Sequence, residues 1–194
     1  MGSSGSSNDS PVPTERPALP GSLWLIGLMG SGKSTVGRAV ADATGRHYVD
    51  NDATIAALAR RSTAALSADV PSTLHTWESA YVRHLLDASG GVVAGIPASS
   101  ADRAEDLSLL AARGVLVYLR CSPATLVDRV LADPPRPWLT SSRRSTEAQV
   151  AAMFAARDSE LSSRSHLTLD AERPVELIVA DLLDFETDRA PTVS

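Results

Sequence analysis

A glycine-rich segment near the start of the chain carries the clearest chemical signal in the sequence. Residues 27–34 read Gly-Leu-Met-Gly-Ser-Gly-Lys-Ser and match the pattern G-x-x-x-x-G-K-[ST] at every position. In such a loop the backbone amides turn toward phosphate oxygens, the lysine supplies a compact positive charge, and the following hydroxyl ligates Mg²⁺. Lys33 is the single lysine among 18 basic residues. The predicted phosphate-binding residues are Gly30, Ser31, Gly32, Lys33, Ser34 and Thr35, with Lys33 also catalytic and Ser34 also a metal ligand.

Two other interpretations of this segment are weaker. A dinucleotide-binding loop of the form G-x-G-x-x-G that begins at Gly30 would require glycine at the position of Thr35. A strand-to-helix turn without a ligand is the second alternative. The complete pattern, however, stands between a strand-like run and a helical pattern, which is the context typical of a phosphate-binding loop.

Two aspartates follow the next strand-like run. Asp50 and Asp52 are separated by one residue, so both side chains can face the same side of an extended chain. The carboxyl ends of parallel strands line the ligand crevice of an open sheet, which places the pair opposite the phosphates. We expect the two carboxylates to hold magnesium through water and to accept the proton of an attacking hydroxyl. The alternative is that Asp52 only caps the following helix.

A proline-rich segment, residues 133–145, interrupts the alternation of strands and helices. It contains three prolines and three arginines, so it is too polar for a core, and we predict that it is a mobile loop. Arg136 in this loop could close over phosphates, stabilise the negative charge that develops during transfer, and exclude water. A solvated surface arginine is the alternative.

Short apolar runs alternate with helical patterns along the rest of the chain. The strand-like runs occupy residues 23–28, 47–50, 91–94, 115–118 and 166–169. The helical patterns occupy residues 34–44, 52–61, 73–88, 101–113, 122–131, 146–162 and 174–185. Strands that alternate with helices form parallel sheets covered on both faces. We therefore predict an α/β fold of three layers, with a central parallel sheet, helices on both faces and a mobile lid.

Composition limits the remaining possibilities. The chain has 194 residues, 43% of them hydrophobic and 21% charged, which suits one domain, predicted at 23–185. We interpret residues 1–22 as a flexible, tag-like start and 186–194 as a flexible tail. A net charge of −5 and 4% aromatic residues argue against nucleic-acid binding, and no apolar run approaches the roughly 20 residues of a membrane span. We expect a cytoplasmic monomer without membrane or nucleic-acid partners.

With these residues placed, residues 23–185 resemble the shikimate kinase family of small phosphate-loop kinases. The likeness is sharpest over residues 25–38, and Asp50-Asn51-Asp52 resembles the family's D-x-D motif. The resemblance implies a kinase fold with a lid, with ATP and Mg²⁺ as cofactors and a small-molecule acceptor. It implies transfer of the γ-phosphoryl group to an acceptor hydroxyl, with shikimate the leading candidate. Asp50 would then bind magnesium, and Asp52 would hold the acceptor hydroxyl and act as its general base.

Four further residues acquire roles from the same resemblance. Arg136, in Arg-Pro-x-Leu, looks like the lid arginine that contacts the phosphates. Arg129 falls where the family packs an arginine on adenine, and Pro174 matches a later loop on the adenine side. Arg157 lies where the family grips the carboxylate of the acceptor.

The departures from the family pattern concern the acceptor. His75 stands where the family's F-R-x-x-E pattern has a second carboxylate-binding arginine, and Gly95 is the one glycine where the family has three. We expect both residues to contact the acceptor. A neutral imidazole cannot reproduce a bidentate arginine contact, so a related sugar acid, an aminocyclitol or a nucleoside is an alternative acceptor. A nucleotide-binding module without turnover is an alternative from another class. A nucleoside monophosphate kinase would need more basic residues around a second phosphate site.

Overall fold

The computed structural model describes residues 21–69, 71–88, 90–132 and 142–189, and its centre is a parallel sheet. The five strands are β1 (Ser22–Ile26), β2 (His47–Val49), β3 (Val92–Ile96), β4 (Gly114–Arg120) and β5 (Leu167–Asp170). They lie in the order β2-β3-β1-β4-β5, and every neighbouring pair is parallel. This arrangement confirms the predicted α/β fold with a central parallel sheet.

The central strand β1 shows why both faces of the sheet are covered. Leu23 and Leu25 point to one face and pack into one buried cluster, whereas Trp24 and Ile26 point to the other face and pack into a second. All four side chains are at most 1% exposed. Apolar residues at consecutive positions are typical of parallel strands that have helices on both sides.

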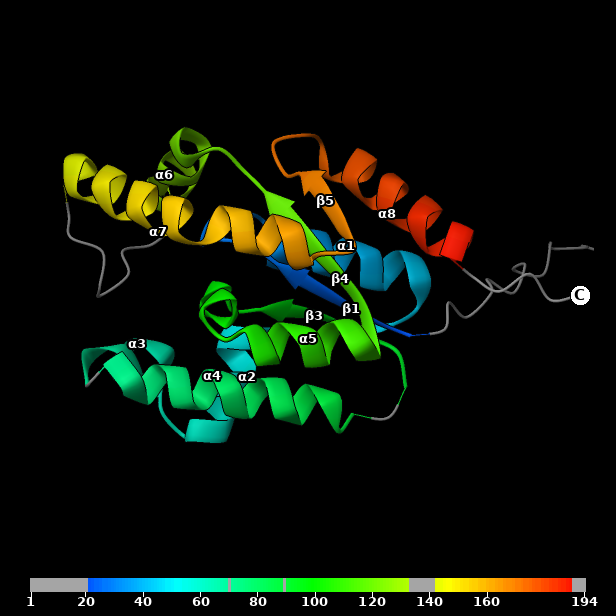
Figure 1. The fold of residues 1–194 in the computed structure, drawn as a ribbon, viewed down its shortest axis with the longest axis horizontal. Coiled ribbons are helices and arrows are strands. Elements are labelled where there is room, and N and C mark those ends of the chain that lie inside the picture. The colour runs from blue at the N-terminus through cyan, green and yellow to red at the C-terminus, as the bar shows by residue number, and fades with distance from the viewer. Residues whose placement is uncertain (1–20, 70, 89, 133–141, 190–194) are drawn as a thin grey trace, which may run out of the picture.

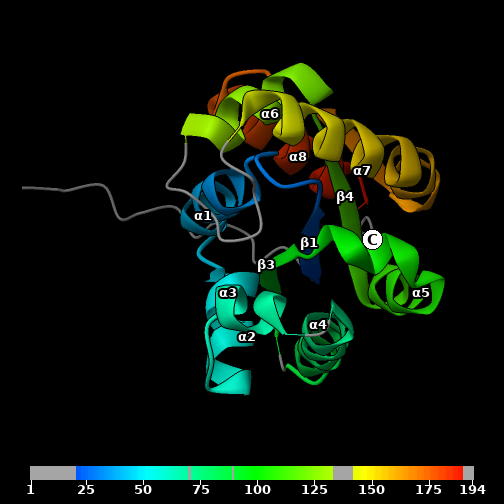
Figure 2. The ribbon, with the colours of Figure 1, turned by 90° about the vertical axis from the view of Figure 1, so that its left-hand side faces the viewer.

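The first face is covered by α1 (Lys33–Thr44), α6 (Pro123–Ala132) and α8 (Val175–Arg189), as Figure 1 shows. The opposite face is covered by α2 (Asn51–Ala59), α3 (Thr63–Ala68), α4 (Pro71–Leu86) and α5 (Ala104–Arg113). Figure 2 shows α1 and α8 on one side of the strands and α2, α4 and α5 on the other. In the described ranges no helix is long and apolar enough to cross a membrane.

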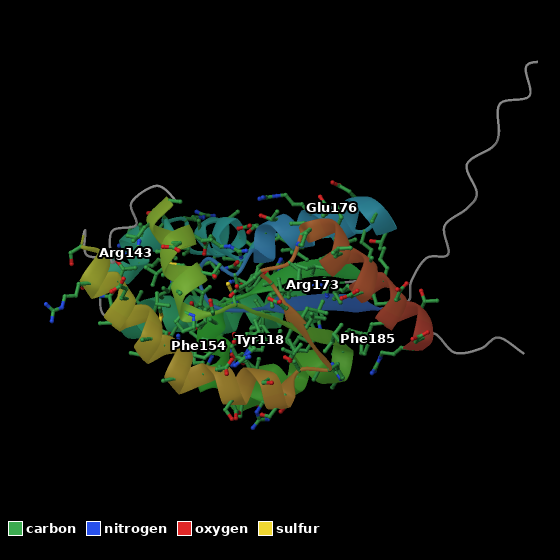
Figure 3. The ribbon with its side chains drawn as sticks, turned by 90° about the horizontal axis from the view of Figure 1, so that it is seen from above. Tyr118, Arg143, Phe154, Arg173, Glu176 and Phe185 are labelled. Carbon is green, nitrogen blue, oxygen red and sulfur yellow. The ribbon has the colours of Figure 1, made fainter. Side chains whose placement is uncertain are left out.

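The long helix α7 (Arg143–Arg164) contributes to both buried clusters. Val150 packs on the first face, and Leu161 packs on the second. Figure 3 shows Arg143 at the outer end of this helix and Phe154 further along it. The last three residues of the segment predicted as a loop, 143–145, belong to this helix, because the Ser142 hydroxyl accepts a 3.3 Å hydrogen bond from the amide of Ser145 and caps the first turn.

Several other boundaries differ from those predicted. The pattern at 101–113 is two elements, the 3-10 helix η1 (Ala98–Asp102) and α5, because Arg103 between them has an extended backbone (φ −130°, ψ 84°). The short helix α3 was not predicted, since its single turn buries only one large side chain, Leu66, among the residues whose burial is described. The rest of the predicted loop, residues 133–141 with Arg136, lies outside the described residues, as do residues 1–20 and 190–194.

The end of α8 is held by a buried ion pair. Arg46, just before β2, pairs with Glu186 of α8, and the two side chains are 7% and 6% exposed. Arg46 also donates a 3.4 Å hydrogen bond to the carbonyl of Gly21. The helix therefore continues to Arg189, and the predicted start of the tail at residue 186 lies inside it.

Candidate active site

The glycine-rich segment forms a loop between β1 and α1, as predicted. Gly30 and Gly32 have φ values of +81° and +90°, in the left-handed region that residues with a Cβ rarely adopt. The amide of Ser31 donates a 3.1 Å hydrogen bond to the carbonyl of Leu28 and closes a turn inside the loop. The curl brings the loop directly to the N-terminus of α1, whose partial positive charge favours anions.

Lys33, the first residue of α1, lies across this loop. Its Nζ donates hydrogen bonds to the carbonyls of Gly27 at 2.7 Å and Leu28 at 3.2 Å. These contacts fix the ammonium beside the loop amides. The loop, the helix terminus and the lysine therefore concentrate positive charge at one place, which is the requirement for holding phosphates.

The next residue, Ser34, connects the loop to the end of β2. Its hydroxyl donates a 2.9 Å hydrogen bond to Oδ2 of Asp50. Oδ1 of the same carboxylate accepts hydrogen bonds from the amides of Asp52 at 3.1 Å and Ala53 at 3.2 Å. Asp50 is thus the N-cap of α2, and the alternative that Asp52 fills this role is wrong, because the helix begins at Asn51.

Two neighbours that the sequence did not single out surround the Asp50 carboxylate. The Tyr48 hydroxyl lies 3.5 Å from Oδ2, and Nη2 of Arg38 lies 3.7 Å from the same atom. The Arg38 guanidinium also stacks over the Tyr48 ring, 5.4 Å from its centroid. Burial raises the pKa of Tyr48 to about 12, so the hydroxyl stays protonated and can donate to Asp50.

These oxygen atoms fit a magnesium site. In the described ranges no group of three or more His, Cys, Asp or Glu side chains could hold a metal by itself. A serine hydroxyl beside one carboxylate is instead the small set of hard oxygen ligands that Mg²⁺ uses when substrate phosphates and water complete its shell. The 2.9 Å approach of Ser34 to Asp50 brings the two predicted metal ligands together.

One cavity of about 900 Å³ extends from the phosphate loop to α4 and the residues after β3. The predicted site residues that line it are Gly30, Ser31, Gly32, Lys33, Ser34, Thr35, Asp52, His75, Arg129 and Arg157. Asp50, Gly95 and Pro174 are not among the lining residues. The cavity therefore joins the residues expected at the nucleotide to most of those expected at the acceptor.

Arg129 lies at the end of the cavity where the nucleotide is expected. Its guanidinium donates to the carbonyl of Gly30 at 3.4 Å and to that of Ala171, after β5, at 2.9 Å. It thereby links the phosphate loop to the segment that starts α8. In that segment Arg173 and Val175 line the cavity, whereas Pro174 is exposed and its carbonyl accepts the first hydrogen bonds of α8.

At the acceptor end, α4 presents His75 and, one turn later, Glu78. Glu78 is 8% exposed and accepts a 2.5 Å hydrogen bond from the hydroxyl of Ser99. Burial raises the pKa of Glu78, against the opposing effects of the Ser99 hydrogen bond and of nearby positive charges. The glutamate of the five-residue pattern 74–78 was visible in the sequence, but its bond to Ser99 joins two elements that no local pattern connects.

Arg157 of α7 lines the same end of the cavity but has a partner in the protein. Its Nε and Nη2 donate to the two carboxylate oxygens of Asp102, at 2.9 and 2.6 Å. The Arg157 guanidinium holds the pKa of Asp102 below its usual value, so the pair stays ionised at neutral pH. Asp102 was not a predicted site residue.

Gly95 lies inside β3 and is not among the residues that line the cavity. It pairs with Leu25 of β1, and its carbonyl accepts a 2.8 Å hydrogen bond from the hydroxyl of Tyr81. A Cβ at Gly95 would lie 3.2 Å from Oδ1 of Asn51, which lines the cavity, so the contact of Gly95 with the acceptor stays a prediction. The lining residues that follow β3 are Pro97, Ala98 and Ser99.

Comparisons with known proteins identify the family of the chain. The family model of shikimate kinase matches residues 29–186. Shikimate kinase of Salinibacter ruber is 33% identical over 189 residues, which cover 92% of this chain and 90% of the relative. Shikimate kinase of Chromobacterium violaceum is 31% identical over 169 residues, which cover 86% of this chain and 90% of the relative. The structure of shikimate kinase from Acinetobacter baumannii in complex with shikimate superposes with a TM-score of 0.81 at 22% identity, and the match covers 90% of this chain and 97% of that one. The chain belongs to the shikimate kinase family.

Proposed function

We propose that this protein transfers the γ-phosphoryl group of ATP to a hydroxyl of shikimate. One observation carries the proposal: a single cavity joins the phosphate loop at Lys33 to the acceptor-side residues Asp52 and Arg157. Phosphoryl transfer requires the donor and the acceptor to be bound side by side in one space that holds little water. Two substrates held in this way react in an effectively unimolecular step, which is faster than a reaction between separate molecules. Membership of the family supports shikimate as the acceptor.

The donor side would act by positioning and by charge. Lys33, the loop amides and the start of α1 would hold the β- and γ-phosphates and meet the charge that develops on them. Ser34 and Asp50 would hold Mg²⁺, which neutralises phosphate charge when bound. Arg129 would pack against the base, and Arg136, from the lid implied by the resemblance, would meet the transferred group.

The acceptor side would orient the attacking hydroxyl. Asp52 lines the cavity two residues after the Asp50 cap, and we assign it the role of holding this hydroxyl and accepting its proton. Arg157 and His75 would face the carboxylate of the acceptor, while Pro97 and Ala98 would supply the wall beside it.

The surroundings in which the protein works follow from the substrates. ATP is an intracellular donor, so we place the activity in the cytoplasm. That the protein acts as a monomer stays a prediction.

A screen of phosphate acceptors tests the proposal. ADP release by the purified chain would be followed with ATP, Mg²⁺ and, in turn, shikimate, gluconate, an aminocyclitol and a nucleoside. We expect shikimate to give the highest kcat/KM and to need both the metal and Lys33. Preference for another acceptor by tenfold or more would overturn the assignment of shikimate. Nucleotide binding without turnover of any acceptor would indicate a binding module.

A further inference from the structure

The acceptor end of the cavity has little uncompensated positive charge. In the described part of the chain the lining arginines are Arg129, Arg157 and Arg173, and only Arg157 belongs to the acceptor end. Arg129 and Arg173 adjoin the segment after β5, at the nucleotide end. Binding of an acceptor carboxylate therefore depends on how Arg157 is held.

Asp102 compensates the charge of Arg157 through two hydrogen bonds. The bonds are 2.9 and 2.6 Å long and use the Nε–Nη2 edge of the guanidinium. Asp102 itself does not line the cavity, and its side chain is 44% exposed against 18% for Arg157. A guanidinium has five N–H donors and Arg157 lines the cavity, so donors remain that Asp102 does not use, but the charge behind them is already paired.

Two other carboxyl groups line this end of the cavity. Asp52 and Glu78 line the cavity beside His75. Arg103, which follows Asp102 in the chain, is held by Asp106 through a 2.6 Å ion pair. An incoming carboxylate thus meets an Arg–Asp pair and further carboxylates, and like charges within a few ångströms weaken its binding.

We propose that Asp102 is a specificity-determining residue, which pairs with Arg157 and thereby weakens the binding of carboxylate-bearing acceptors relative to uncharged ones. This inference rests on the proposed function, because it takes the cavity end at Arg157 to be the acceptor subsite. It assigns to Asp102 a role that acts through Arg157 and not by contact with the acceptor.

Two substitutions of Asp102 distinguish the effect of its negative charge from the effect of its hydrogen bond to Arg157. Asp102→Asn removes the negative charge but keeps an oxygen that can accept from Arg157, whereas Asp102→Ala removes both. The matched control is Asp158→Asn. Asp158 follows Arg157 in α7 and forms an equivalent two-bond pair with Arg120, at 2.8 and 2.9 Å. Neither residue lines the cavity of the candidate site, and Arg120 lines a separate pocket together with Phe154. Figure 3 labels two neighbours of the Asp158–Arg120 pair: Tyr118, whose hydroxyl donates to Asp158, and Phe154, whose ring lies under the Arg120 guanidinium.

The measurements are the KM and kcat for shikimate, the KM for ATP, and calorimetric Kd values for shikimate and its uncharged methyl ester. Asp102→Asn should lower the KM and Kd for shikimate by about three- to tenfold. The Kd for the ester and the KM for ATP should stay unchanged, and Asp158→Asn should change none of them. Asp102→Ala should bind shikimate at least as tightly as the wild type.

The possible outcomes separate this inference from the proposed function. Turnover of shikimate by the wild type decides the function, whereas the ratio between variants decides the role of Asp102. Unchanged or weaker shikimate binding in Asp102→Asn overturns the inference even if the wild type is a good enzyme, because Asp102 would then merely orient Arg157. Equal tightening for shikimate and the ester overturns it as well, as does a lack of shikimate binding by every variant.

Discussion

The Ser34 hydroxyl donates a 2.9 Å hydrogen bond to the Asp50 carboxylate and joins the start of α1 to the end of β2. The second oxygen of that carboxylate caps α2 through two backbone amides. One side chain therefore serves both the proposed metal site and the start of a helix. Suitable substitutions should separate these two roles.

Asparagine at position 50 should keep the helix cap and damage the metal site. Asn caps helices as well as Asp does, so we expect Asp50→Asn to change the free energy of unfolding little while the Mg²⁺ concentration needed for half-maximal turnover rises at least tenfold. Asp50→Ala should also lose about 1 kcal/mol of stability. Urea unfolding and a Mg²⁺ titration of turnover measure the two effects. Equal Mg²⁺ dependence in wild type and Asp50→Asn would remove Asp50 from the metal site.

Lys33→Ala should abolish turnover and leave the fold intact. Lys33 contacts carbonyls of its own loop and contributes no large apolar side chain to the core, whereas its ammonium would meet the charge that develops on the phosphates. We expect kcat to fall by at least a hundredfold with an unchanged circular dichroism spectrum. Turnover near the wild-type value at saturating acceptor would contradict the assigned role.

His75→Arg should strengthen shikimate binding. The new guanidinium would stand one helical turn from Glu78 and could supply a second charged donor to the acceptor carboxylate. A charge-assisted hydrogen bond of about 1.5–3 kcal/mol corresponds to roughly ten- to a hundredfold in KM. His84→Arg is the matched control, because His84 is an exposed residue of the same helix. An equal KM in both variants would show that position 75 does not face the carboxylate.

Glu186→Ala should destabilise the whole domain. It would leave Arg46 as an unpaired charge that is only 7% exposed, and such a loss typically costs about 3–5 kcal/mol. Asp188→Ala, at an exposed position two residues later on α8, is the control and should cost less than about 0.5 kcal/mol. Chemical denaturation compares the three proteins. Similar midpoints for all of them would mean that the end of α8 contributes nothing to stability.

Asp158 should make the free energy of unfolding depend on pH in the acidic range. The hydrogen bond from Arg120 holds the pKa of Asp158 below its ordinary value, so the pair contributes stability above the unfolded-state pKa of about 3.9. That contribution is lost as the pH falls below this value toward the native pKa. Because Arg120 is half exposed, Asp158→Asn should cost at most about 1 kcal/mol at pH 7. The gap between variant and wild type should narrow as the pH falls below about 3.9, and a gap that widens there would contradict the assignment.

Local spacing predicted the parts of the site that lie close together in the sequence. The phosphate loop, the Asp50–Asp52 pair and the alternation of strands and helices each follow from neighbouring residues. The pairs that shape the acceptor end do not: Arg157 meets Asp102 across 55 positions and Ser99 meets Glu78 across 21. Such contacts depend on how η1, α4 and α7 pack, which no short pattern encodes. The position where β3 ends, one residue after Gly95, likewise depends on pairing with β1.

Transfer of labelled phosphate tests the central claim most directly. The chain would be incubated with Mg²⁺, shikimate and ATP that carries a radioactive γ-phosphoryl group, and the products would be separated. We predict that the label appears in a phosphate ester of shikimate in the wild type and not in Lys33→Ala. Label that remains in ATP, or passes only to inorganic phosphate, while the wild type binds both ATP and shikimate would contradict the claim that this cavity carries out phosphoryl transfer.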